Sequence, residues 1–160
     1  MILWVDADSC PVPVRDMICR TGKRLELTVC YVANRDIPRD ADAPVTMIIA
    51  DTTPDAADEY IVENSAPGDL VITRDIPLAR RLVDNQIRVI NDRGTVYTDE
   101  NIRERLAMRN LMLELYTSGL APEKTGQFGK KELNNFANAL DQEITRLLKQ
   151  SLPRPGNVPE

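Results

Sequence analysis

The sequence of 160 residues, with 42% hydrophobic and 28% charged side chains, is long enough for one globular domain with a single core. It contains no histidine, which excludes Ser-His and Cys-His nucleophilic systems and imidazole metal ligands, so any catalysis would have to depend on carboxylates. The net charge of −5 weighs against strong non-specific binding to phosphate backbones, and the three cysteines lack the Cys-x-x-Cys spacing of a zinc site.

The first segment of the chain predicts a strand followed by a helix. Residues 2–5 form a short, continuous apolar run, which is typical of a central parallel strand covered on both faces. Ser9 or Cys10 can cap a helix that starts with Pro11, where the missing N–H costs nothing. This helix is predicted to run to about Arg20 and to stop at Gly22.

The middle of the chain continues the alternation of strands and helices. Apolar β-prone runs predict the strands, and helical spacing of apolar residues predicts the helices. The predicted elements are strands at residues 25–33, 45–49, 69–73 and 87–90, with helices at residues 55–63 and from Asp75 onward. Strands separated by helices imply right-handed crossovers, so we expect an α/β fold with a mostly parallel five-stranded sheet and helices on both faces.

The last third of the chain predicts helices that pack back on this sheet. Residues 95–97 could pair briefly as an edge hairpin, and Thr98 or Asp99 caps a long helix that ends before Gly119. A loop is expected at residues 122–129. The final helix carries one apolar stripe, formed by Leu133, Phe136, Ala137, Leu140, Ile144, Leu147 and Leu148. Residues 1–150 are thus predicted to form one domain, followed by a disordered tail at residues 152–160.

Acidic or amide side chains follow nearly every predicted strand. Ligands of open parallel sheets bind beyond the carboxyl ends of the strands, near the point where the strand order reverses. Several carboxylates gathered there raise one another's proton affinity unless a cation compensates, and hard oxygen ligands suit Mg²⁺ or Mn²⁺. The side chains at these strand ends are Asp6, Asp8, Asp51, Asp55, Asp58, Glu59, Asp75, Asn91 and Asp92.

Not every one of these aspartates needs a metal to explain it. Asp55 and Asp75 stand where a helix cap is expected, and aspartate is a common cap. Asp6 and Asp8 have no such explanation, because they directly follow a fully apolar strand at the expected ligand crevice. We therefore expect Asp6 and Asp8 to lead a divalent-metal site.

Several strings of residues resemble a known family. They are WVDADSCPV at residues 4–12, VAN at 32–34, PGDLVITRDIPLA at 67–79, NDRG at 91–94, YTDENIRERLAMR at 97–109 and FANALD at 136–141. In these strings the chain resembles the YaiI/YqxD family of uncharacterised bacterial proteins, over roughly residues 1–148.

The resemblance implies a PIN-like fold, in which nucleases of the wider superfamily hold Mg²⁺ or Mn²⁺ between strand-end carboxylates. Carried over by motif, Asp6 and Asp8 stand in the first acidic position, Asp55 and Asp58 in the helix after the third strand, and Asp75 after the fourth. Before the last helix the chain departs from the family pattern, because residues 127–131 are QFGKK where members often carry Pro-Phe-Ser and then Asp-Arg. The resemblance therefore implies no role for that loop.

The leading hypothesis is a metal-dependent nuclease that hydrolyses phosphodiester bonds in RNA or single-stranded nucleic acid. Catalysis is assigned to Asp6, Asp8, Asp58 and Asp75, which together with Asp55 would hold Mg²⁺ or Mn²⁺, and phosphate contact is assigned to Arg74 or Arg109.

Three alternative functions stay open. A haloacid-dehalogenase-like phosphatase is suggested by Asp6-Ala7-Asp8 and by a Thr73 hydroxyl that could bind phosphate, but no lysine lies between residues 24 and 123. A response-regulator receiver likewise lacks the lysine expected after the fifth strand. The non-enzymatic alternative is a PIN-like binding or regulatory module that engages RNA or a protein partner.

The same sequence bears on location and assembly. No apolar run approaches the roughly 20 residues needed to span a bilayer, and residues 1–5 lack the basic segment of an export signal. We therefore expect a cytoplasmic protein with no membrane partner. A homodimer stays open.

Overall fold

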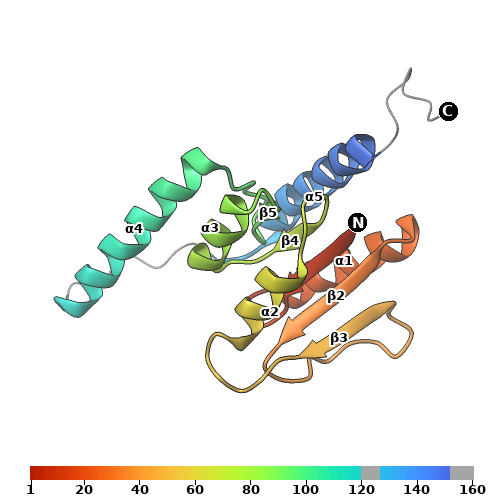
Figure 1. Cartoon of the computed structure of the whole chain (residues 1–160), viewed down its shortest axis with the longest axis horizontal. Coiled ribbons are helices and arrows are strands. Elements are labelled where there is room, and N and C mark those ends of the chain that lie inside the picture. The colour runs from red at the N-terminus through yellow and green to blue at the C-terminus, as the bar shows by residue number, and fades with distance from the viewer. Residues whose placement is uncertain (120–126, 152–160) are drawn as a thin grey trace.

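The computed structural model describes residues 1–119 and 127–151. Strands and helices alternate along the first part of the chain except that β3 follows β2 without a helix between them, and two long helices follow the last strand (Figure 1). The strands are β1 (Ile2–Asp6), β2 (Thr28–Ala33), β3 (Val45–Ile49), β4 (Leu70–Ile72) and β5 (Arg88–Ile90). The helices are α1 (Val12–Leu25), α2 (Ala56–Asn64), α3 (Ile76–Asp84), α4 (Asp99–Thr117) and α5 (Lys130–Ser151). Among the described residues, no helix combines the length and the apolar character that a bilayer crossing requires.

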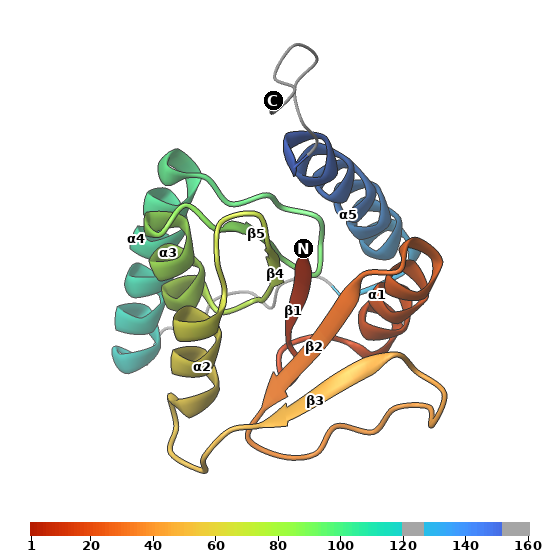
Figure 2. The same cartoon turned by 45° about the vertical axis from the view of Figure 1, so that its right-hand side comes forward.

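The five strands are all parallel and lie in the order β3-β2-β1-β4-β5 (Figure 2). β1 is central, with β2 on one side and β4 on the other. The strand order therefore reverses between β1 and β4, where an open parallel sheet leaves a crevice beyond its carboxyl ends. The predicted five-stranded parallel α/β sheet is confirmed, and it is consistent with the PIN-like fold that the resemblance implies.

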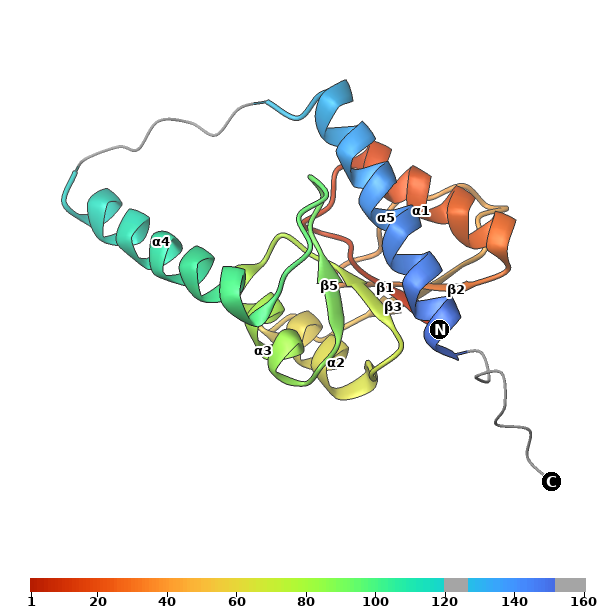
Figure 3. The same ribbon diagram turned by 90° about the horizontal axis from the view of Figure 1, so that it is seen from above.

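Helices cover both faces of this sheet, as predicted, so each face has its own core. α1 and α5 lie together on one face, and α2 and α3 pack on the other (Figure 3). Successive residues of β1 divide between the two cores, because side chains alternate along a strand. Leu3 and Val5 pack with α1 and α5, whereas Trp4 packs with α2 and α3. All three are buried, which explains why this strand is apolar throughout.

The predicted start and end of the first helix were wrong. Neither Ser9 nor Cys10 caps α1; its N-cap is Pro11, which makes no side-chain capping bond. The helix also continues through Gly22 to Leu25 and ends at Glu26, whose φ of 56° is left-handed. Gly22 instead permits close packing, because a Cβ there would lie 2.5 Å from Cγ2 of Val29 on β2.

The other predicted elements occur with small shifts of their ends. β3 has the predicted bounds, whereas β2 begins later because α1 extends to Leu25 and its C-cap and the following turn occupy residues 26–27. The predicted edge hairpin is a single antiparallel bridge between Ile90 and Val96. Thr98 caps α4 as predicted, in a capping box with Asn101. Part of the predicted loop at residues 122–129 and the whole tail at residues 152–160 lie outside the described residues.

Asp69, predicted to open the fourth strand, instead fastens the amino ends of two strands. Its Oδ1 accepts a hydrogen bond from the backbone N–H of Ile2 at 2.9 Å, and its Oδ2 accepts from Trp4 Nε1 and Ala66 N, both at 3.1 Å. Asp69 is itself buried. Its carboxylate therefore holds β1 beside β4 at the end of the sheet opposite the expected ligand crevice.

Removing this carboxylate should weaken the fold. Asp69→Ala leaves three donors without their acceptor, and we expect it to lower the free energy of unfolding by about 3 kcal/mol in urea denaturation. Asp69→Asn keeps one carbonyl oxygen and should lose roughly half as much. Equal losses for the two variants would contradict the acceptor role.

Candidate active site

One pocket of about 530 Å³ opens at the carboxyl ends of β1, β2 and β4, next to the start of α2. It coincides with the reversal of strand order between β1 and β4, as expected for an open parallel sheet. We call it the aspartate pocket, after five of its lining residues. It is lined by Asp6, Asp8, Ser9, Asn34, Pro54, Asp55, Ala57, Asp58, Arg74 and Asp75.

Asp6 lies at the buried end of this pocket. Its side chain is the last of β1, and Thr73 Oγ1 donates a hydrogen bond of 2.7 Å to its Oδ2. The same Thr73 hydroxyl accepts from the backbone N–H of Asp75 at 3.0 Å. Burial raises the pKa of Asp6 against the effect of the Thr73 and Ser9 hydrogen bonds, and the charges of Asp75 and Asp8 raise it further. The carboxyl group is thus held in a fixed orientation in a place that disfavours its negative charge.

Ser9 ties together the two loops that form the crevice. Its hydroxyl donates to the backbone oxygen of Asp6 at 3.1 Å and accepts from the backbone N–H of Arg74 at 3.2 Å. The loop after β1 and the loop after β4 are therefore joined by one side chain. This explains why Asp8 and Asp75, which flank these contacts, line the same pocket.

Asp8 lies at the open side of the pocket. Its Oδ1 accepts from Arg35 Nε at 3.3 Å, and its Oδ2 is 3.4 Å from the backbone N–H of Asn34. Both side chains of the ion pair are well exposed, at 40% for Asp8 and 68% for Arg35. Asn34 Oδ1, in contrast, is buried and has no hydrogen-bond donor within the described part of the chain.

Asp58 and Asp75 complete the acidic lining. Burial is the main cause that raises the pKa of Asp58, followed by the charges of Asp75, Asp6 and Asp55, and together they bring it to about 7 in spite of Arg81. Asp75 caps α3 as predicted, because its Oδ1 accepts from the backbone N–H of Leu78 at 3.0 Å. The cap uses one carboxylate oxygen, and the side chain still lines the pocket.

The raised pKa of Asp58 makes a prediction for the metal-free protein. Between about pH 4, the ordinary range of an aspartate, and about pH 7, the folded protein retains a proton that the unfolded chain has lost, so stability falls as the pH rises through this window. Asp58→Asn should abolish this loss of stability, because asparagine does not ionise. Allowing for solvent screening, we expect a gain of about 1–2 kcal/mol at pH 8 and none near pH 4.

Thermal unfolding followed across this pH range measures the effect, with a chelator present throughout. The matched control is Asp51→Asn, which removes an exposed carboxylate that follows β3 and does not line the pocket. The control should change the pH profile little. A gain for Asp58→Asn that is the same at every pH would show that Asp58 carries no such penalty.

The donor groups of the aspartate pocket suit a hard cation. Carboxylate and amide oxygens are the ligands that Mg²⁺ and Mn²⁺ prefer, and Asn34 Oδ1 adds an acceptor for which the described residues provide no donor. Like charges around Asp58 also favour neutralisation by a cation. The side chains are not preassembled, since no three His, Cys, Asp or Glu side chains in residues 1–119 and 127–151 form a group that could hold a metal ion. The residues fit a cation by chemistry, and binding would require side chains to turn.

The remaining strand-end residues have structural partners outside the pocket. Glu59 forms an ion pair with Arg81, Asn91 accepts from the backbone N–H groups of Arg93 and Thr95, and Asp51 accepts from the N–H of Thr52. The nearly fully buried Asp92 lies 3.6 Å from Arg74 Nε.

The two predicted phosphate-binding arginines differ in position. Arg74 lines the aspartate pocket with its side chain half exposed. Arg109 is exposed on α4 and is not among the residues that line the pocket. Within one chain, the structure therefore brings Arg74 to the predicted site and leaves Arg109 outside it.

Sequence reasoning assigned no part in the nuclease site to Ser9, Asn34 or Thr73. Asn34 could have been found by the rule that identified the aspartates, because it directly follows β2 at the same edge of the sheet. Thr73 follows β4 in the same way. Ser9 carried no such signal, because its role is to bridge two loops.

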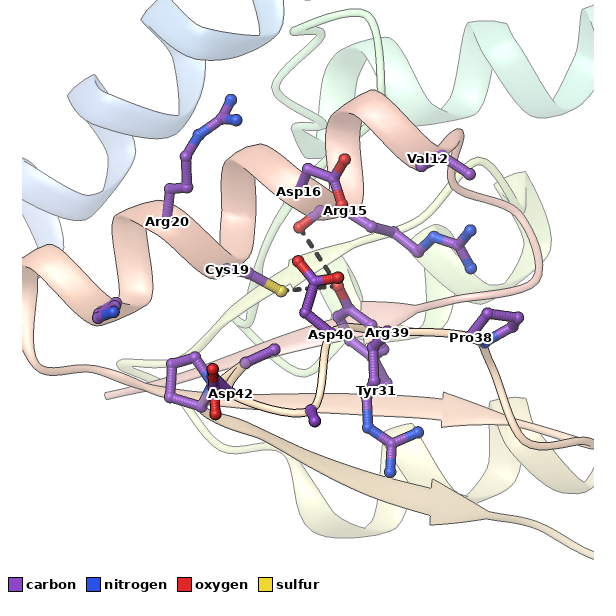
Figure 4. Close-up of a pocket in the computed structure, with 14 residues that line it drawn as sticks. Val12, Arg15, Asp16, Cys19, Arg20, Tyr31, Pro38, Arg39, Asp40 and Asp42 are labelled. Atoms are coloured by element: carbon purple, nitrogen blue, oxygen red, sulfur yellow. Dashed lines mark hydrogen bonds between the residues drawn. The ribbon is translucent and has the colours of Figure 1, made fainter.

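A second cavity, of about 560 Å³, lies between α1 and the segment that joins β2 to β3 (Figure 4). Its charged lining residues have both signs: Arg15, Arg20, Lys23, Arg39, Asp16, Asp40 and Asp42. The Cys19 thiol in its wall shares a hydrogen bond of 2.8 Å with the Tyr31 hydroxyl, and burial raises the pKa of this thiol. A protonated thiol is a poor nucleophile, so this cavity offers neither a reactive group nor a surface of one charge.

The strand order also bears on the alternatives. Receiver domains have the order 2-1-3-4-5, in which the first strand lies between the second and third. Here β1 lies between β2 and β4, so the topology differs from that of a receiver. Asp6 is buried with a raised pKa, which also makes it a weak candidate for the carboxylate nucleophile of a phosphatase.

Comparisons with known proteins agree on one family. The model of the family described as "Uncharacterized BCR, YaiI/YqxD family" matches residues 4–146. A UPF0178 protein of Treponema denticola is 54% identical over 150 residues, covering 94% of this chain and 96% of its own. Those of Treponema pallidum and Psychromonas ingrahamii are 48% and 46% identical, covering 100% and 93% of this chain and 90% and 99% of their own. No solved structure is significantly similar to the chain.

Proposed function

The chain belongs to the YaiI/YqxD family, whose description assigns no activity, and from the chemistry of its aspartate pocket we propose that it is a divalent-metal-dependent nuclease. The substrate class is RNA or single-stranded nucleic acid. The observation that carries the proposal is the gathering of five aspartates around one pocket at the reversal of strand order, beside an amide oxygen that has no donor in the part of the chain that the structure describes. Such a gathering of acids is unfavourable without a cation.

Each residue of the pocket would have a separate role in metal binding or in positioning water. Asp6, fixed by Thr73, and Asp8 and Asp75 would hold Mg²⁺ or Mn²⁺, and Asp58 or Asp55 would complete the shell or position the attacking water. When bound, the ion would activate that water and stabilise the departing oxygen of the phosphodiester.

Asp8 would have to turn away from Arg35 to join the shell. Because exposed ion pairs contribute only about 0–1 kcal/mol, this change costs little. Arg35 would then be released at the mouth of the pocket.

Arg74 would contact the substrate phosphate from the edge of the pocket. Its side chain is 52% exposed, and its pairing with the buried Asp92 holds the guanidinium near the pocket without covering it. Arginine suits this role because its planar guanidinium can donate two parallel hydrogen bonds to a phosphate. No role in the pocket is proposed for Arg109.

Metal-dependent stability and cleavage test the proposal together. Saturating Mn²⁺ or Mg²⁺ should raise the unfolding free energy, by about 2.7 kcal/mol at a hundred times the Kd, and EDTA should reverse the effect. The metal-loaded protein should cleave single-stranded RNA or DNA. A protein whose unfolding ignores both ions and that leaves RNA and DNA intact would contradict the proposal.

A non-catalytic module on the same scaffold is the second candidate. The observation that favours it is that three of the pocket's carboxylates already have partners, since Thr73 donates to Asp6, Asp75 caps α3 and Asp8 pairs with Arg35. For such a module Asp8→Asn should leave RNA or protein binding intact. A nuclease should instead lose turnover in this variant.

A further inference from the structure

Most of α4 extends beyond the sheet (Figures 1 and 3). Its first turn is fixed by the capping box of Thr98 and Asn101, and Ile102 is buried in the core that also contains α3. Ile102 is the only buried residue of the helix. The later turns therefore have most of their surface in solvent.

This exposed part of α4 is apolar. Residues 108–116 are MRNLMLELY, in which six of the nine side chains are apolar. Among the residues that the structure describes, six large hydrophobic side chains are exposed, and four of them are Met108, Leu111, Leu113 and Tyr116, at 48–60%. A helix that is apolar on most of its surface is normally buried, and a contiguous exposed apolar surface marks an interaction site. This part of α4 therefore needs a cover that residues 1–119 and 127–151 of one chain do not supply.

The apolar side chains have the spacing of a coiled-coil seam. Met108, Met112 and Leu115 follow at intervals of four and three residues, which aligns them along one side of the helix. Leu111 and Tyr116 flank this line. We call these five residues the α4 stripe. By helical periodicity Met108, Leu111 and Leu115 lie away from the side that Ile102 and Leu106 occupy, so α3, which packs at Ile102, does not cover them, whereas Tyr116 lies on the flank nearer Ile102.

We propose that the α4 stripe is the dimer interface of this protein, and that it packs in parallel against the α4 stripe of a second copy. The charges beside the stripe select both the partner and the orientation. Glu104 lies on one flank and Arg109 on the other, and neither has an ion-pair partner in the described part of the chain. In a parallel two-fold pair, the Glu104 flank of one helix meets the Arg109 flank of the other. A residue on the first flank then faces the residue five positions further along the partner helix.

Glu104 of one copy therefore meets Arg109 of the other, and the two-fold axis produces this ion pair twice. In an antiparallel pair, each flank would instead meet its own counterpart. The Arg109 flank of one helix would then face the Arg109 flank of the other, and the like charges would repel. Arg105 stands three residues before Met108 and so continues the line of the stripe, and its contact of 3.5 Å with Thr95 Oγ1 holds it toward its own chain, away from the arginine of the second copy. One helix thus carries every apolar and charged group that the symmetric pair requires.

Sedimentation equilibrium of the full chain over a wide range of concentrations tests the dimer. We expect a species of twice the 18.0 kDa chain mass. Met112→Glu should raise the dimer dissociation constant at least about 30-fold, the effect of losing one interface hot spot, with an unchanged circular dichroism spectrum. The control is Asn110→Glu, which adds the same charge on the far side of the helix and should leave the dimer intact.

A charge exchange tests the parallel register. Glu104→Arg and Arg109→Glu should each weaken the dimer, and the two changes together should restore it. A wild-type chain that stays monomeric, or a Met112→Glu variant that dimerises as tightly as the wild type, would overturn the interface. Failure of the double exchange to restore dimerisation would overturn the parallel orientation. Both experiments are independent of metal binding, so they are unaffected if the nuclease proposal fails.

Discussion

Asp8→Asn is expected to lower metal-dependent cleavage at least about 100-fold, because loss of a metal ligand should exceed the 10–100-fold effects of removing a ligand's hydrogen-bond partner. The fold should survive the change. Asp8 is exposed, and the asparagine oxygen can still accept from Asn34 N–H or from Arg35. The variant should also lose the stabilisation by Mn²⁺, since one negative ligand is absent. Initial cleavage rates and thermal unfolding with and without Mn²⁺ measure the two effects on the same sample.

Asp36→Asn is the matched control for this variant. Asp36 is also an exposed aspartate that pairs with an arginine, Arg39, but it lies outside the aspartate pocket. The control should keep both cleavage and the response to Mn²⁺. If Asp8→Asn keeps half or more of the wild-type cleavage rate, the aspartate pocket is not the site of hydrolysis.

The sequence predicted those parts of the candidate site that follow from strand ends alone. The apolar run of β1 located Asp6 and Asp8, and the alternation of strands and helices placed Asp58 and Asp75 at the same edge of the sheet. These inferences need only the rule that parallel strands end together. These inferences do not depend on which strands are neighbours in the sheet.

The partners of these aspartates could not be predicted, because they depend on strand order and register. Val5 pairs with Ile72, so the next residues along, Asp6 and Thr73, meet across β1 and β4. Asp6 pairs with Val32 on the other side, which brings Asp8 to the N–H of Asn34. A local sequence pattern contains neither fact.

Local signals failed where tertiary packing decides. Gly22 looked like a helix stop, but it is a site of close contact with Val29. The helical spacing of α4 was predicted correctly, yet nothing in it indicated that the helix would leave the sheet after Ile102. The position of Arg109 outside the aspartate pocket follows from that departure.

Gly94→Ala is the substitution with the largest expected effect on stability. Gly94 has a φ of 85°, and a Cβ there would lie 2.4 Å from the backbone oxygen of Asn135 and 2.7 Å from its carbonyl carbon. Both atoms belong to α5, whose next residue, Phe136, is fully buried in the core. Left-handed strain and overlap with a helix backbone together should cost about 3–5 kcal/mol in urea denaturation.

Gly68→Ala separates these two causes. Gly68 has a φ of 101°, but no atom lies within 4 Å of a Cβ built there, so this variant should show only the backbone strain, about 1–2 kcal/mol. The excess cost at Gly94 then measures how closely α5 is packed against the turn after β5. That turn begins with Asn91 and Asp92, and Asp92 pairs with Arg74 at the aspartate pocket. Displacement of α5 should therefore also reduce cleavage through Arg74, whereas equal costs for the two glycines would contradict the close contact.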